Sequence, residues 1–119
     1  MRIEHVALWT ADIERLRAFY ERHLGARAGE RYENAGNGFA SYFLEFEGGT
    51  RLELMQMPGG AGSFAHLAFS LGSEPAVDAA TERLRAAGVT VAGEPRRTGD
   101  GYYESVVLDP DGNRIELTA

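Results

Sequence analysis

Two histidines and two glutamates are the side chains whose type and spacing point most directly to chemistry. His5 and Glu53 lie in the first half of the chain, and His66 and Glu116 lie in the second half. Two imidazoles and two carboxylates form a ligand set that suits a divalent Zn, Ni, Co, Mn or Fe ion, with waters completing an octahedral arrangement. A catalytic metal requires such open positions. The four residues therefore predict one divalent metal site.

The same residues mark an internal repeat. The segment 4–8 (EHVAL) matches 65–69 (AHLAF), and the segment 49–54 (GTRLEL) matches 112–117 (GNRIEL). Both matches are separated by about sixty residues and occur in the same order, which argues against a chance match. A repeat of this kind predicts that the two halves fold as similar modules.

The pattern around each glutamate predicts the face on which it lies. Side chains alternate between the two faces of a strand, so Leu52 and Leu54 should point toward a helix and Glu53 away from it. The neighbours of Glu116 have the same pattern. If the two modules pair about a pseudo-twofold axis, both His–Glu pairs converge in one cup.

Each position also has a simpler interpretation when it is taken alone. A single histidine on a strand is more often a hydrogen-bonded core residue, and a glutamate in an RxEL segment is usually a solvated charge. Arg51 and Arg114 share the parity of the glutamates and would suit them as ion-pair partners. The repeated placement of all four residues favours the metal site. His23 has no counterpart in the repeat and lies in the last turn of a predicted helix, where it suits the helix dipole.

The order of predicted elements is strand, helix and further strands, and it occurs twice. In the first half we expect a strand over 2–9, a helix from the N-cap candidates Thr10 and Asp12 to Gly25, and strands over 39–46 and 50–57 joined by a Gly-Gly turn. In the second half we expect a strand over 64–70, a helix from Ser73 to Gly88, a short strand near 89–92, a polar loop over 93–101, and strands over 102–108 and 113–118 joined by a turn. These elements predict an α+β fold in a single domain, 1–119, with modules at 1–57 and 64–119 and a linker at 58–63.

The composition narrows the classes of function. The chain has 119 residues, a net charge of -6 and no cysteine. The negative charge argues against binding to nucleic acid, and the lack of cysteine excludes disulfides, thiolate metal sites and cysteine nucleophiles. No apolar run approaches the roughly 20 residues of a membrane span, and no signal peptide is visible. We therefore expect a cytoplasmic protein that binds small molecules and does not associate with membranes.

Four segments together resemble the vicinal oxygen chelate superfamily, which includes glyoxalases, type I extradiol dioxygenases, fosfomycin-resistance enzymes and bleomycin-binding proteins. The segments are HVALWTADIERLRAFYERHLGA, YFLEFEGGTRLELM, AHLAFS and LDPDGNRIEL, which begin at residues 5, 42, 65 and 108. The resemblance implies two paired βαβββ modules whose curved sheets enclose a metal. It also implies a homodimer, because relatives commonly dimerise, and the sequence leaves open whether one chain or two supply each site.

Within this superfamily, the pattern of His5, Glu53, His66 and Glu116 is similar to that of bacterial lactoylglutathione lyases. The resemblance implies a metal that binds two neighbouring oxygens of a hemithioacetal, and a reaction through an enediolate. It implies that Glu116 removes the proton from carbon and that Glu53 takes the complementary step. Two alternatives remain, namely an Fe(II)-dependent ring-cleaving dioxygenase and a non-catalytic protein that binds a small molecule or an antibiotic.

Five further residues are candidates for the substrate pocket. Trp9 stands where the lyases usually have a basic residue, and Met55 and Met57 share the parity of Glu53, so this wall is expected to be apolar. Arg97, beside Arg96, would hold an anionic substrate group unless its loop is simply solvated. Tyr102 represents a Tyr-Tyr pair at 102–103, of which one ring should face the cup. Trp9 and Met57 would also suit ordinary packing between the modules.

Overall fold

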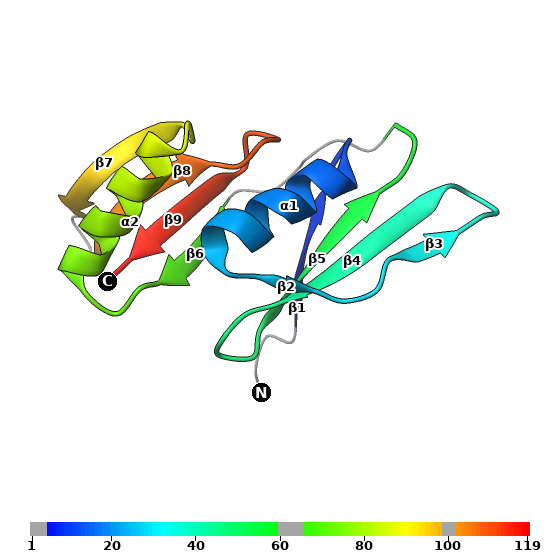
Figure 1. The fold of residues 1–119 in the computed structure, drawn as a ribbon, viewed down its shortest axis with the longest axis horizontal. Coiled ribbons are helices and arrows are strands. Elements are labelled where there is room, and N and C mark those ends of the chain that lie inside the picture. The colour runs from blue at the N-terminus through cyan, green and yellow to red at the C-terminus, as the bar shows by residue number, and fades with distance from the viewer. Residues whose placement is uncertain (1–4, 60–65, 99–101) are drawn as a thin grey trace. The chain divides into compact units, whose positions relative to one another are not determined.

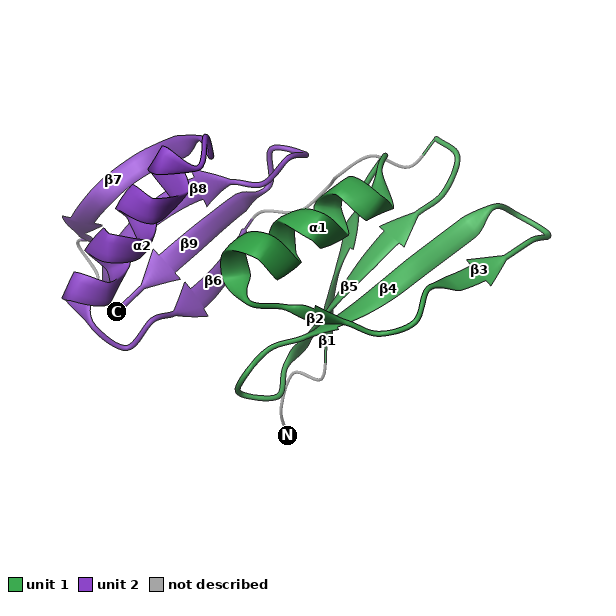
Figure 2. Ribbon diagram, viewed as in Figure 1, with its two compact units in different colours: residues 1–64 green, residues 65–119 purple. Residues whose placement is uncertain are grey.

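The computed structural model of the protein describes residues 5–59, 66–98 and 102–119. The chain divides into two compact units, residues 1–64 and residues 65–119 (Figure 2). Each unit combines strands of mixed direction with a helix, so the predicted α+β class is confirmed.

The first unit is a sheet covered by one helix within its described residues (Figure 1). Its sheet order is β1-β5-β4-β2, and β3 pairs with β4 as well. The pairing of β1 with β5 is parallel, whereas β4 runs antiparallel to β5. The elements are β1 (His5–Trp9), α1 (Ile13–Leu24), β2 (Arg27–Ala28), β3 (Tyr32–Asn34), β4 (Phe39–Glu45) and β5 (Arg51–Gln56).

The second unit repeats this plan. Its sheet order is β6-β9-β8-β7, with β6 parallel to β9 and β8 antiparallel to β9. The first and last strands of each unit therefore lie side by side. The elements are β6 (Leu67–Ser70), α2 (Glu74–Ala86), β7 (Val91–Arg97), β8 (Tyr103–Leu108) and β9 (Arg114–Thr118).

Helix α1 begins and ends where the sequence predicts. The side chain of Asp12 accepts a hydrogen bond from the backbone N–H of Arg15, which satisfies one of the free donors of the first turn. Gly25 ends the helix with a φ of 69°, a left-handed conformation that glycine adopts without steric cost. His23 lies in the last turn with its ring centroid 5.0 Å from that of Phe19, as expected for a structural residue.

Each helix buries an apolar stripe against one face of its sheet. In the first unit, α1 packs on β4 and β5, where Leu44, Leu52 and Leu54 are at most 3% exposed. In the second unit, α2 packs on β7, β8 and β9. Ser73 caps α2, and Pro75 lies in its first turn, where a missing N–H costs nothing.

A buried pair of hydroxyls links α2 to β8. The Thr81 and Ser105 side chains are fully buried, and their oxygens lie 2.7 Å apart. The Thr81 hydroxyl also donates to the backbone carbonyl of Val77 at 2.7 Å. This contact satisfies polar groups that would otherwise be buried at a cost of about 1–3 kcal/mol.

Several predicted boundaries differ from the observed ones. The polar loop expected over 93–101 is wrong in its first part, because β7 continues from Val91 to Arg97. Gly93 and Pro95 are uncommon inside strands, but β7 is the edge strand of its sheet and accommodates them with two shifts in register against β8. The short strands β2 and β3 were not predicted. Residues 2–4, 60–65 and 99–101 of the predicted elements lie outside the described residues.

None of the helices described here combines the length and the apolar character that crossing a membrane would require.

We expect Thr81→Val to destabilise the protein by about 1–3 kcal/mol, because it leaves the buried Ser105 hydroxyl without this partner. The double variant Thr81→Val/Ser105→Ala should recover part of the loss, since both polar groups are then removed. Urea denaturation of the two variants and of Thr81→Ser, which keeps the hydroxyl, would measure this. A Thr81→Val protein as stable as the wild type would contradict the role assigned to the pair.

Candidate functional site

His5 and Glu53 form a pair on the face of the first sheet that α1 does not cover. Leu52 and Leu54 are buried on the α1 side, so Glu53 points to the opposite face, which we call the open face. The His5 Nε2 atom lies 3.9 Å from the Glu53 Oε2 atom, and the two side chains are 43% and 16% exposed. The parallel pairing of β1 with β5 produces this approach, because it places His5 opposite Arg51, two residues before Glu53 and therefore on the same face of the sheet.

Aromatic contacts surround this pair. The His5 ring meets the Phe43 ring edge to face, with centroids 5.4 Å apart. The Arg51 guanidinium lies 4.3 Å from the centroid of the same Phe43 ring, a cation–π contact. Phe43 pairs with Glu53 across β4 and β5, so it occupies the same face and helps to hold the imidazole.

His66 and Glu116 form the equivalent pair in the second unit. The His66 Nδ1 atom lies 3.8 Å from the Glu116 Oε1 atom, and the side chains are 51% and 21% exposed. His66 directly precedes β6, and Ala68 of β6 lies opposite Glu116 in the register with β9. This arrangement repeats that of Ala7 and Glu53 in the first unit.

The second pair borders a hollow of about 400 Å³. The hollow is polar, since its lining includes two carboxylates, an imidazole and two hydroxyls. Its residues are His66, Ala68, Tyr102, Glu104, Glu116 and Thr118.

The two donor atoms of each pair are near enough for small side-chain adjustments to bring both to one metal ion. Two donor atoms held at about 2.1 Å from one ion lie about 3 Å apart when adjacent and about 4.2 Å apart when opposite. The observed distances of 3.9 and 3.8 Å fall between these values. Across residues 5–59, 66–98 and 102–119, no group of three or more His, Asp or Glu side chains is gathered for a metal. Each unit thus brings together two of the four residues that the sequence predicts as ligands.

The predicted apolar wall lies on the open face of the first unit. Trp9 pairs with Met55 in the register of β1 and β5, two residues beyond Ala7 and Glu53. Met57 follows β5 and is 39% exposed. Trp9 and Met55 thus share a surface with the His5–Glu53 pair.

The structure separates the two adjacent tyrosines of the second unit. Tyr102 lines the hollow beside Glu116. The Tyr103 hydroxyl instead donates to the carboxylate of Asp78 in α2 at 2.7 Å, and this hydrogen bond raises the pKa of Tyr103. Tyr103 is therefore engaged with the helix, on the other side of the sheet from Tyr102.

Arg97 lies with Tyr103 rather than with the hollow. Its guanidinium forms an ion pair with Glu74 at the start of α2 and lies 5.8 Å from the centroid of the Tyr103 ring. Arg97 is thus placed away from the residues that surround Glu116. Its backbone belongs to β7, whose continuation past residue 92 was not predicted.

Two residues of the hollow, Glu104 and Thr118, were not predicted. They lie opposite each other in the pairing of β8 with β9, and Thr118 shares the parity of Glu116. The alternation of side chains from Tyr102 and from Glu116 would have placed both on the same face.

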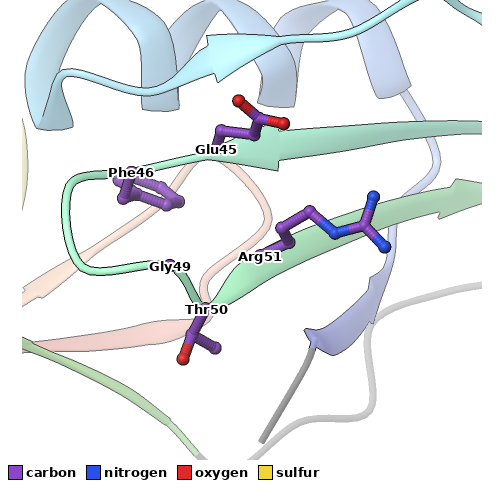
Figure 3. A pocket seen from close by; sticks show the side chains of 5 residues that line it. All are labelled: Glu45, Phe46, Gly49, Thr50 and Arg51. Atoms are coloured by element: carbon purple, nitrogen blue, oxygen red, sulfur yellow. The ribbon is translucent and has the colours of Figure 1, made fainter.

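A second hollow, of about 290 Å³, lies at the hairpin that joins β4 to β5 (Figure 3). Figure 3 shows the Glu45 and Thr50 side chains pointing to opposite sides of the hairpin. Because these polar groups do not converge, the hollow lacks the arrangement expected of a binding site. Its lining residues are Glu45, Phe46, Gly49, Thr50 and Arg51.

Comparison with known structures gives the same architecture. A lactoylglutathione lyase from Agrobacterium tumefaciens superposes with a TM-score of 0.78 at 24% identity, and the match covers 98% of this chain and 92% of that one. Glyoxalase I from Zea mays superposes with a TM-score of 0.81 at 21% identity over 98% of this chain. This chain spans only 44% of the maize protein's length. At these identities the likeness shows the fold.

Sequence comparison shows the family. The uncharacterized protein PA2024 of Pseudomonas aeruginosa is 32% identical, and the match covers 98% of this chain and 86% of that protein. The model of one protein family matches residues 2–117, a span that includes both His–Glu pairs. With its duplicated modules and its family match in agreement, the chain belongs to the Glyoxalase/Bleomycin resistance protein/Dioxygenase superfamily.

Proposed function

We propose that the protein is a glyoxalase-like, metal-dependent lyase or isomerase that acts on a small substrate with two neighbouring oxygens, of the hemithioacetal type. In this proposal, His5, Glu53, His66 and Glu116 are the ligands of one divalent ion. The observation that carries it is the repeated pair, in which a histidine and a glutamate approach within 3.9 Å in one unit and 3.8 Å in the other.

The ligand atoms support this assignment chemically. Imidazole nitrogens and carboxylate oxygens together suit Zn, Ni, Co, Mn or Fe(II). A bound divalent ion would polarise two neighbouring oxygens and stabilise the negative charge that develops when a nearby C–H loses its proton. Both pairs are partly exposed, so a small substrate can approach them.

The two glutamates take the proton-transfer roles in this proposal. Glu116 accepts the proton from the substrate carbon, and Glu53 carries out the complementary proton transfer on the other face of the substrate. The carboxylate of Glu116 borders the hollow of the second unit, where Tyr102, Glu104 and Thr118 can orient polar groups of the substrate. The assignment of the base to Glu116 follows from the resemblance to lactoylglutathione lyases.

The presence of Glu53 supports the lyase over the dioxygenase. The dioxygenases that this chain resembles use two histidines and one glutamate, without an acidic ligand at the position of Glu53. Here Glu53 is 16% exposed and lies beside His5, which supports a role as a ligand over that of a solvated surface charge.

We also propose that the protein forms a homodimer in the cytoplasm, since members of the superfamily are often dimeric. A metal site shared between chains can be distinguished from one within a chain by mixing two variants. One variant lacks His5 and Glu53, and the other lacks His66 and Glu116. A shared site is restored in mixed dimers, whereas a site within one chain is not.

We expect the wild-type protein to bind one divalent ion per predicted site. His5→Ala and His66→Ala should each weaken binding by about 100-fold or more, because each removes a direct ligand. Elemental analysis and calorimetric titration with Ni, Co, Zn, Mn and Fe(II) would measure this. His23→Ala is the matched control, since His23 contacts Phe19 in α1 and should leave metal binding unchanged. Failure of every metal to bind stoichiometrically would overturn the proposed site.

We expect Glu116→Gln to lower turnover of the methylglyoxal–glutathione hemithioacetal by about 10²–10⁴-fold, because glutamine has nearly the same size but cannot accept the proton. Glu94→Gln is the control, since Glu94 forms an exposed ion pair with Arg85. The increase in absorbance of the thioester product would measure the rate of the reaction.

Other outcomes would point to other functions. A fully metal-loaded wild-type protein without turnover would exclude this substrate. Oxygen uptake with a catechol, retained in Glu53→Gln, would indicate the dioxygenase. Ligand binding that survives metal removal and alanine at both histidines would indicate a non-catalytic binding protein.

A further inference from the structure

Three aromatic side chains form a surface that the proposed reaction does not use. Trp9 meets Phe39 edge to face with ring centroids 6.2 Å apart, and Tyr32 meets Phe39 with centroids 6.1 Å apart. Trp9 and Phe39 are half-buried, and Tyr32 is 56% exposed. We call Trp9, Tyr32 and Phe39 the aromatic patch.

The aromatic patch lies on the open face of the first unit, together with the His5–Glu53 pair. Trp9 pairs with Met55, two residues along the strand from the pairing of Ala7 with Glu53. Two residues of strand correspond to about 6.6 Å. Tyr32 lies opposite Ser41, which in turn lies opposite Met55, so the patch continues the same surface across β3, β4 and β5.

The end of the open face that carries the patch is uncharged in the described strands. Besides the three aromatic rings, its positions in the register are Ser41, Met55 and Asn34. Arg51 lies beyond Glu53, at the opposite end of the face, and pairs with His5 across β1 and β5. A glutathione arm carries two carboxylates and an ammonium group, and burying such charges without partners is costly. An aromatic ring would lose no such interactions with water.

We propose that the aromatic patch binds an aryl substituent of the substrate, attached next to the two oxygens that the metal holds. This inference rests on the proposed function, since it places the oxygens at the His5–Glu53 pair. The edge-to-face contact of Trp9 with Phe39 leaves ring surface available for a further offset or edge-to-face contact. The preferred substrate is therefore a compound of the proposed hemithioacetal type that carries an aryl substituent beside its vicinal oxygens, with the aromatic patch holding the aryl ring and not a glutathione arm.

A pair of hydroxamic acids tests this inference in the metal-loaded protein. Acetohydroxamate and benzohydroxamate present the same two neighbouring oxygens to a metal, and they differ in carrying a methyl group or a phenyl ring. We expect benzohydroxamate to bind about tenfold more tightly, the ratio expected for one added aromatic contact. Calorimetric titration of both compounds would measure the ratio.

The variants assign this preference to the aromatic patch. Trp9→Leu and Phe39→Leu should each reduce the affinity ratio to about two or less, while the affinity for acetohydroxamate stays near that of the wild type. Leu71→Ala is the matched control, because Leu71 is an exposed apolar residue of the second unit and should leave the ratio unchanged. Circular dichroism would confirm that each variant is folded, and the two separate variants protect the test against the misfolding of either one.

The fluorescence of Trp9 gives an independent measurement, because it is the only tryptophan in the sequence. We expect benzohydroxamate to change its emission in the wild type, acetohydroxamate to have little effect, and acrylamide to quench it in the free protein. Equal affinity for the two hydroxamates in metal-loaded protein would overturn the aryl preference but leave the proposed metal site intact. Protection of Trp9 from acrylamide would show that another protein surface covers the patch, which also overturns it. Absence of metal binding would instead reject the proposed function.

Discussion

The alternation of side chains along β5 and β9 is the constraint on which the rest of the structure depends. Leu52 and Leu54 on β5, and Ile115 and Leu117 on β9, are at most 3% exposed and pack toward the helices. Because successive side chains point to opposite faces, Glu53 and Glu116 are held on the open faces by the burial of their neighbours. A shift in register by one residue would bury a carboxylate and expose two leucines. The apolar core therefore fixes the position of the polar groups.

The features that follow from local chemistry could be predicted from the sequence. The N-caps Asp12 and Ser73 and the C-terminal Gly25 mark the helices, because each satisfies a specific backbone requirement. The two His–Glu pairs could be predicted because the short sequence segments that contain them occur twice in the chain. The pairing of each histidine with its own glutamate across parallel strands follows from the fold, which the family match confirms.

The features that were missed depend on which strand lies at an edge and on how neighbouring strands pair. Gly93 and Pro95 usually indicate a loop, but an edge strand tolerates both, so β7 could not be recognised from composition. The pattern predicted that one of Tyr102 and Tyr103 faces the cup, but which one it is depends on the register of β8, which the Tyr-Tyr pair does not reveal. Tyr32 could not be linked with Phe39, since β3 spans only Tyr32–Asn34 and has no apolar alternation.

The parallel pairing of β1 with β5 has a consequence for how the protein folds. His5 lies in the first strand of its unit and Glu53 in the last, so these residues meet only when nearly the whole unit has closed. Contacts between such distant positions form slowly, because the entropy of closing the intervening chain must be overcome first. An ion that binds the closed pair but not the open chain would shift the equilibrium toward closure. If His5 and Glu53 bind the proposed ion, the concentration of metal would then help to set the stability of the contact between β1 and β5.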